Sequence, residues 1–365
     1  MPAAKLPTFY EVMELIPDEK GAIKHFENLR WPNGVQCIAC KSDDVFRGKV
    51  GKDRKQKVHL PRWECRECHR QFTVICGTVM ENTKIPLRKW LMAFHEIGSA
   101  KHGISSRELA RKLGITLRSA WHLSHRIRAT MADNTQQFKG IVETDETYIG
   151  GKRRHHGRGY RGNKVAVQTI VSRTGDAGVG QAQTMALGPN DHVDGRTVGA
   201  KLRRHTEPKK TVLMTDDSQI YDRVGKNFAE HHTVNHSKEE YVRQDVDGYL
   251  VSTNTAEGLF ANLKRQIIGT HHSTSKKHLP RYLEEYDYKY NTRDVSDTER
   301  TATAMMQMEG KRVRLFKSPT GDGDALFDRK ADEPSTSGTR RGEPAQRKAG
   351  IPVIERGRRR RRKHV

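Results

Sequence analysis

Four of the five cysteines form two Cys-x-x-Cys pairs separated by 24 residues. Two residues between cysteines let both thiolates of a tight turn face one ion, and two such turns complete the tetrahedral sulfur site that Zn2+ prefers. One redox pair plus two unrelated buried thiols would not account for the repeated spacing. The predicted ligands of a structural zinc are Cys37, Cys40, Cys65 and Cys68. The nearby His69 and Cys76 are expected not to be ligands, because four thiolates already fill the shell.

Two aspartates, Asp145 and Asp216, each lie in a stretch with the pattern of a β-strand. Carboxylates held close together repel each other unless a cation lies between them. Oxygen ligands and phosphates suit Mg2+ better than zinc. Two Mg2+ or Mn2+ ions bridged by carboxylates can cut or join a phosphodiester, because one activates the attacking oxygen and the other stabilises the leaving oxygen. These aspartates are therefore candidate catalytic metal ligands.

A third ligand is expected from a later helix that begins near Asn254. Seven residues correspond to about 700°, nearly two full turns, so Glu257 and Lys264 share one line along this helix. The carboxylate could reach the metals while the ammonium holds a DNA phosphate. Asn254-x-x-Glu257 is also a good capping box, and local spacing does not separate these interpretations.

The order of the surrounding elements would bring the two aspartates together. Alternating apolar residues and Gly-containing turns predict three strands, then a helix, then a buried fourth strand. This is the opening order of a ribonuclease H-like fold, in which the first and fourth strands are neighbours. Asp145 in the first strand would then approach Asp216 at the tip of the fourth. The expected strands are residues 139–149, 164–171, 180–187 and 211–215, and the expected helix is about 193–205.

Several nearby side chains are expected to have other roles. Glu143 shares a face with Asp145 and could be an accessory ligand, but a solvated acid at the end of the strand is the favoured interpretation. Glu146 is expected to point to the opposite face, and Asp217 to face solvent. A tyrosine at every fourth residue of a later helix indicates core packing. These tyrosines are Tyr282, Tyr286 and Tyr290.

Residues 81–135 have the pattern of short helices. Ser105 and Glu108 form a capping box, Gly114 allows a sharp turn, and Thr116 can cap a further, basic helix. Two short helices about a glycine turn suggest a helix-turn-helix, although a plain helical hairpin fits the pattern equally well. The candidate DNA-binding residues are Arg118, His122 and Arg126, together with Lys264 and Arg265 of the later helix.

The composition indicates the class of partner. The chain has 365 residues, a formal net charge of +23 and 34% hydrophobic residues. This surplus favours a polyanionic partner, because Lys and Arg gain affinity by releasing counterions from phosphates. No stretch reaches the roughly 18 apolar residues of a membrane helix, no signal peptide is evident, and the cysteines do not suggest a disulfide framework. We therefore expect an intracellular protein that binds nucleic acid and no membrane.

The expected fold class is mixed α/β, in four parts. A zinc ribbon of short strands and loops occupies residues 1–80, and a helical connector occupies 81–135. A ribonuclease H-like sheet flanked by helices follows at 136–310. Residues 318–365, rich in Gly, Pro, Ser, Asp and Arg, lack apolar periodicity and are expected to form a disordered basic tail.

Five stretches resemble one bacterial insertion-sequence transposase family, which carries an N-terminal zinc ribbon followed by a DDE-type domain. VETDETYIGGK and VLMTDD surround the two aspartates, and the long run from STNTAEGLFANLKRQIIG to YLEEYDYKYNTR surrounds the later helix. GTVMENTKIPLRKW and GISSRELARKLGITLRSAWHLSHRIR are similar to the same family's connector. The resemblance covers roughly residues 8–295 and excludes the arginine-rich tail.

This resemblance implies the roles of the site residues. Asp145 and Asp216 would be the first two acidic ligands, Glu257 or Asn254 the third, and Lys264 the downstream lysine on the same helix. The main hypothesis is a transposase that binds the ends of its element, cuts DNA and joins the 3′-hydroxyl ends to target DNA. We expect it to act as a homo-oligomer on double-stranded DNA in the bacterial cytoplasm, associated with the nucleoid. The alternatives are a catalytically silent DNA-binding regulator and a ribonuclease H-like nuclease that cuts without joining.

Overall fold

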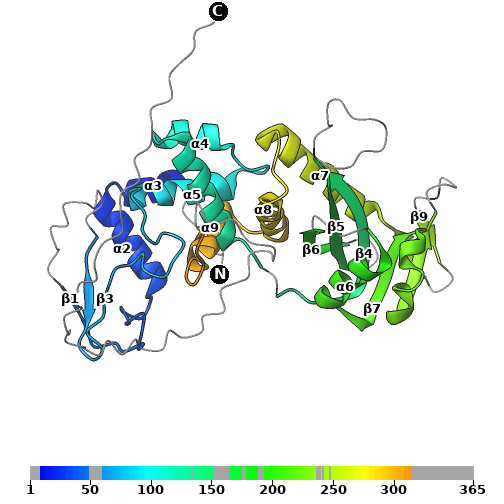
Figure 1. Cartoon of the computed structure of the whole chain (residues 1–365), viewed down its shortest axis with the longest axis horizontal. Coiled ribbons are helices and arrows are strands. Elements are labelled where there is room, and N and C mark those ends of the chain that lie inside the picture. Colours follow the sequence, from blue (N-terminus) through cyan, green and yellow to red (C-terminus); the bar gives the residue numbers. More distant parts are fainter. Residues whose placement is uncertain are drawn as a thin grey trace, which may run out of the picture. The chain divides into compact units, whose positions relative to one another are not determined.

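The computed structural model describes residues 9–48, 60–133, 135–150, 164–174, 178–187, 193–235, 240, 242–245 and 248–313. All of them belong to one compact unit that runs from Met1 to Asp324, and Figure 1 shows the arrangement of their helices and strands. The tail predicted at 318–365 lies outside the described residues. No described helix is long and apolar enough to cross a membrane.

A small antiparallel sheet holds the cysteine-containing segment together. Its strands are β1 (Val45–Arg47), β2 (Trp63–Cys65) and β3 (Gln71–Phe72). The order is β1-β2-β3, with Val45 opposite Cys65 and Trp63 opposite Phe72. Buried Cys37, Cys65 and Phe72 form its core. The predicted ribbon of short strands is confirmed in this part of the chain.

Two helices precede this sheet, where we expected only strands and loops. They are α1 (Phe9–Leu15) and α2 (Glu19–Arg30). The carboxylate of Asp18 accepts a hydrogen bond from the amide of Gly21 at 2.8 Å and so caps α2. Ile23 and Phe26 of α2 are buried. The expectation for residues 9–30 was wrong, although an aspartate cap followed by apolar residues three apart was a readable helix signal.

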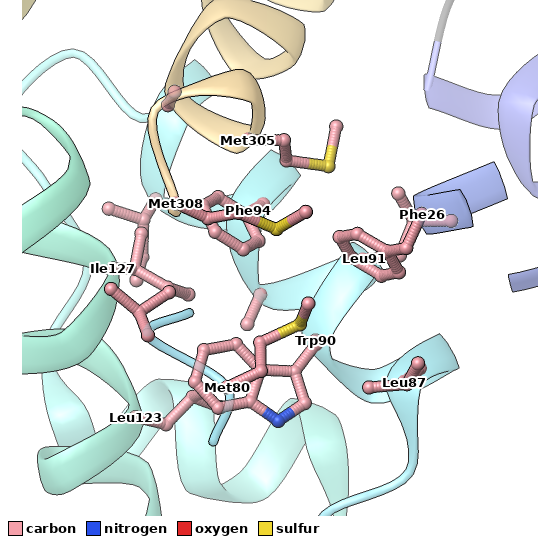
Figure 2. Close-up of a cluster of buried hydrophobic side chains, with 14 of the residues drawn as sticks. Phe26, Met80, Leu87, Trp90, Leu91, Phe94, Leu123, Ile127, Met305 and Met308 are labelled. Carbon is pink, nitrogen blue, oxygen red and sulfur yellow. The ribbon is translucent and has the colours of Figure 1, made fainter. Parts of the chain in front are cut away.

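The helices of the connector share one hydrophobic core. They are α3 (Leu87–Ser99), α4 (Ser106–Leu113) and α5 (Leu117–Thr130), joined by the C-terminal α9 (Asp297–Met306). Figure 2 shows side chains from several of these helices gathered around Trp90 and Phe94 of α3. Met305 and Met308 belong to this core, although we assigned residues up to 310 to the catalytic region. The domain bounds stay predictions.

The turn between α4 and α5 has the predicted local chemistry. Ser105 accepts a hydrogen bond from the amide of Glu108, and Thr116 accepts one from the amide of Ser119, each at 3.2 Å. Gly114 ends α4 with a φ of +58°, in the left-handed region that favours glycine. These bonds and the left-handed Gly114 give the turn between α4 and α5 a defined conformation.

A mixed five-stranded sheet forms the centre of the following region (Figure 1). Its strands are β4 (Phe138–Ile149), β5 (Val165–Thr174), β6 (Gly178–Ala186), β7 (Thr206–Asp216) and β8 (Glu230–Val234), and α6 (Gly195–His205) lies between β6 and β7 in the sequence. Their order is β6-β5-β4-β7-β8. β4 pairs antiparallel with β5 and parallel with β7. The first and fourth strands are thus neighbours, as the predicted ribonuclease H-like fold requires.

Each face of the sheet is covered. On one face, Val142 and Leu213 pack with α6 and with Tyr221 of the 3-10 helix η1 (Gln219–Tyr221). On the other, Ile149 and Val167 pack with α7 (Asn254–Arg265) and α8 (Leu279–Asn291). The predicted packing of tyrosines on α8 is confirmed, since Tyr282 and Tyr286 are buried in this second core and Tyr290 packs against it.

The remaining elements lead into and out of α7. A second 3-10 helix, η2 (Gly225–Asn227), precedes β8. The antiparallel pair β9 (Val242–Gln244) and β10 (Leu250–Ser252) comes directly before α7. A π-helix, η4 (Gln266–His271), continues α7.

Candidate functional site

The four predicted cysteine ligands form a compact sulfur cluster. Their Sγ atoms all lie within 4.8 Å of one another, with separations of 3.5 Å for Cys37–Cys68 and Cys40–Cys65 and 3.6 Å for Cys40–Cys68. A tetrahedral zinc with Zn–S bonds of about 2.3 Å would separate its sulfurs by about 3.8 Å. The cluster therefore supports a structural zinc, and His69 and Cys76 lie outside it, as predicted.

The two cysteine turns have the same backbone form. Lys41 and His69 each lie four residues after the first cysteine of their turn, with φ values of +66° and +56°. The Ala39 amide donates to Sγ of Cys37 at 3.4 Å. Although burial opposes ionisation, amide donors from Cys40 and Ala39 lower the pKa of Cys37 to about 7. A thiolate, the form that binds zinc, is thus favoured at Cys37. Although backbone amides oppose the shift, burial and the neighbouring thiols raise the pKa of Cys40 and that of Cys68.

The strand register brings Asp145 and Asp216 together. The parallel pairing of β4 with β7 places Glu143 opposite Met214, and continuing it by two residues places Asp145 opposite Asp216, the last residue of β7. Neighbouring strands lie about 4.8 Å apart, and paired positions point to the same face. Both aspartates are half-buried. Their carboxylate oxygens are a donor set that suits Mg2+ or Mn2+.

A third carboxylate, that of Glu146, lies on the opposite face of β4 and is affected by the charges of this pair. Tyr221 of η1 donates a hydrogen bond to its Oε1. Burial, together with the negative charges of Asp145 and Asp216, raises the pKa of Glu146 to about 7, although the bond from Tyr221 opposes the shift. The direction of Glu146 was predicted correctly, but its electrostatic link to the aspartates was not foreseen.

Glu143 is not the solvated acid that we expected. Its side chain is fully buried and forms an ion pair with Arg173 of β5. It also accepts hydrogen bonds from Thr255 Oγ1 at 2.8 Å and from the Ala256 amide at 3.0 Å. The expectation was wrong because the first turn of α7 covers this position, so Glu143 serves as a helix cap rather than as a surface acid.

The candidates for the third ligand lie on the first turn of α7, and both are exposed. Asn254 is the first helical residue, whereas the N-cap is Thr253, whose side chain makes no capping bond. The predicted capping box of Asn254 and Glu257 is therefore wrong. Among the described residues, no group of three or more acidic or histidine side chains is gathered as tightly as the cysteines. The choice between Glu257 and Asn254 stays a prediction.

The predicted DNA-binding residues differ in exposure. Arg118, Lys264 and Arg265 are exposed, and His122 is half-buried, with Nε2 3.3 Å from the carbonyl oxygen of Val313. Arg126 instead is buried.

The guanidinium of Arg126 donates to the carbonyl of Glu81 at 2.7 Å and lies 5.1 Å from the Trp90 ring centroid. Burial lowers the pKa of Arg126 to about 10. Arg126 therefore packs in the helical core, and the prediction that it contacts DNA is wrong because its side chain is buried.

Asp217, at the end of β7, is exposed, as predicted. Its Oδ2 accepts a hydrogen bond from Asn235 at 2.7 Å. Asp217 is therefore an acidic residue next to Asp216 that does not belong to the pair of Asp145 and Asp216.

Known proteins resemble the chain over both of these regions. Residues 137–291 match the model of the ISXO2-like transposase domain, and residues 17–71 match that of the transposase zinc-ribbon domain. A relative from Halobacterium salinarum, described as an uncharacterized protein in transposable element ISH50, is 26% identical over 288 residues, which cover 74% of this chain and 90% of the relative. The chain therefore belongs to the family of insertion-sequence transposases in which a zinc ribbon precedes an ISXO2-like transposase domain.

Proposed function

We propose that this transposase binds the ends of an insertion sequence, cuts the DNA there and joins the freed 3′-hydroxyl ends to target DNA. The main support is the parallel β4–β7 register, which ends with Glu143 opposite Met214 and, if continued by two residues, would place Asp145 opposite Asp216. Both aspartates also contribute to the raised pKa of Glu146, after the larger effect of burial, which is consistent with both carboxylates lying near this side chain.

In this proposal, Asp145 and Asp216 hold the divalent ions through carboxylate oxygens. Two bound Mg2+ or Mn2+ ions would activate the attacking oxygen and stabilise the leaving oxygen of each in-line phosphoryl transfer. Glu257 completes the set, with Asn254 as the alternative. Lys264 lies seven residues after Glu257, on the same line of α7, so its exposed ammonium can hold a DNA phosphate without contacting the metals.

We also propose that α4 and α5 act as a helix-turn-helix. Arg118 lies in the first turn of α5, where recognition helices present their base-contacting residues. The bonds from Ser105 and Thr116 give the turn a fixed geometry that supports such a role. Because an insertion sequence has two ends to be cut together, we expect the protein to act as a homo-oligomer on DNA.

A strand-transfer assay tests this function. The zinc-loaded full chain would be mixed with labelled double-stranded element ends, a supercoiled target plasmid and Mg2+. We expect nicked ends and joined products, both suppressed by EDTA. Nicking without joining would favour a nuclease, and binding of ends without nicking would favour a silent regulator.

A further inference from the structure

A buried ion pair connects the strand that carries Asp145 with the helix that carries Glu257. Glu143 lies two residues before Asp145 on β4, and its carboxylate is paired with the Arg173 guanidinium of β5. The side chain of Glu143 is 0% exposed and that of Arg173 is 3% exposed. Because burying two charges carries a large desolvation penalty, such an ion pair is stable only if further hydrogen bonds offset that penalty.

The partners of this pair all lie at the entry to α7. Arg173 donates to the Leu250 carbonyl at 2.5 Å, and to the carbonyl and hydroxyl oxygens of Ser252 at 2.7 and 2.6 Å. Glu143 accepts from Thr255 and from the amide of Ala256. The pair thus binds both the strand that precedes α7 and the first turn of α7 itself.

This arrangement replaces the helix's own cap. The first amides of a helix lack intrahelical partners and are usually satisfied by the N-cap side chain. Thr253 at this position makes no such bond. Instead, the carboxylate of Glu143 on β4 lies at the positive end of the helix dipole and accepts a hydrogen bond from the Ala256 amide of the helix above it.

We propose that Glu143 and Arg173 are positioning residues for the metal site. They fix the first turn of α7 against β4, so that its third ligand faces Asp145 and Asp216. The inference rests on the proposed two-metal function but makes a separate claim, because neither residue touches metal or DNA. A well-packed apolar pair could stabilise the same core equally well, whereas only directed hydrogen bonds fix the rotation and height of the helix.

The mildest test removes one hydrogen bond without a charge. Thr255→Val keeps the shape of the side chain and loses the bond to Glu143, and Thr255→Ser keeps the hydroxyl. Titration of the zinc-loaded full chain with Mn2+ alone, followed by electron paramagnetic resonance, would give the affinity. We expect Thr255→Val to weaken Mn2+ binding about tenfold, as losses of supporting hydrogen bonds around metal ligands do, and Thr255→Ser to bind as the wild type does.

A stronger test changes Glu143 itself. Glu143→Gln should weaken Mn2+ binding by about 10- to 100-fold and speed amide hydrogen exchange in peptides covering residues 252–260. Glu285→Gln is the matched control, because Glu285 forms an equally buried pair with Arg128 but bonds to α5 and not to α7. The control should lose stability without a change in Mn2+ affinity.

Two outcomes would overturn the inference. One is wild-type Mn2+ affinity in both Thr255→Val and Glu143→Gln, which would reduce the pair to a structural role. The other is the absence of any Mn2+ binding by the wild type. If the variants behave as expected but the wild type neither cuts nor joins DNA, the proposed function fails and the positioning role stands.

Discussion

Three acidic residues within four positions of β4 have three different environments. Glu143 is buried under α7, Asp145 is half-buried, and Glu146 contacts Tyr221 on the far face. Alternation along a strand separates the two faces, and the cover on each face then decides the chemistry. One acid caps a helix, one is a candidate metal ligand, and one responds to the charge of the pair.

The third ligand can be identified by two substitutions on α7. If Glu257 holds metal, Glu257→Gln should abolish cutting and joining, because the amide keeps the shape and loses the charge. Asn254→Ala should then remain active and nearly as stable as the wild type, because Asn254 is not the cap of α7. Strand-transfer assays and thermal unfolding of both variants would check this. The reverse pattern would assign the ligand to Asn254.

His95 makes stability depend on pH. It is buried on α3, and this burial, followed by the charge of His25, lowers the pKa of His95 to about 4 although Asp297 opposes the shift. The folded state therefore favours neutral His95, and its contribution is complete above the ordinary value of 6.5 and is lost as the pH falls toward 4.

At about pH 5 the loss should be about 2 kcal/mol relative to pH 7.5. Urea unfolding of the wild type and of His95→Gln at the two pH values would measure it. The difference in unfolding free energy between the two pH values should be smaller in the variant. An equal difference in both proteins would refute the assignment to His95.

The sequence indicated which face each acid takes but not what covers that face. Glu143 and Arg126 were misjudged for the same reason, since both are charged residues covered by elements far away in the chain. The partner of Glu143 is 30 residues away and the helix it caps is 113 residues away. Local patterns carry no information on such contacts. The Cys-x-x-Cys spacing, in contrast, is itself local and places both thiols of a turn near one ion.

At the level of elements, the alternating patterns predicted β4 to β7 and α6 well, because each strand has one or two buried faces and is bounded by turn residues. The four-strand order followed from the sequence of element types. The helices α1 and α2 were missed because the cysteine motifs dominated the interpretation of residues 1–80. Their apolar residues pack mainly on α3, in the helical core.

The ribbon should depend on zinc for its fold. Among the described residues, its own core has three buried residues, two of which are cysteines, so Cys65→Ser should unfold it and weaken binding to element ends. Cys76→Ser is the matched control, since this cysteine lies outside the sulfur cluster and should keep the metal. Elemental analysis should find one zinc per chain in the wild type and in the control. A metal-free wild type of full DNA affinity would rule the zinc site out.

For the molecule as a whole, a buried network joins α5 to the helices of the sheet region. Arg128 of α5 and Lys289 of α8 donate to the two carboxylate oxygens of Glu285 at 2.5 and 2.6 Å. Although burial opposes ionisation, Lys289 and Arg128 hold the pKa of Glu285 well below its ordinary value. The proposed DNA-recognition helix is thus tied to α8, which also bonds to β6 through Asp287 and Asn291.

The net charge of +23 leads to a prediction about the tail, which lies outside the described residues. Deleting residues 340–365 removes eleven Lys and Arg side chains. Binding to all DNA should weaken alike, with a shallower dependence on salt, because fewer counterions are released. Filter-binding titrations over a range of salt concentrations, on element ends and on unrelated DNA, would measure this. A loss confined to element ends would instead mean that the tail reads sequence.

Asp145 and Asp216 are proposed to hold the catalytic metals together, and strand transfer by their asparagine variants is the decisive experiment. Asp145→Asn and Asp216→Asn should each abolish cutting and joining, because the amide binds divalent ions far more weakly than a carboxylate. Binding to element ends should stay intact or strengthen slightly, since a negative charge near the DNA is removed. Asp217→Asn, at the exposed neighbouring position, should keep full activity. Joined products from both aspartate variants at the wild-type rate would show that these carboxylates do not hold the catalytic metals.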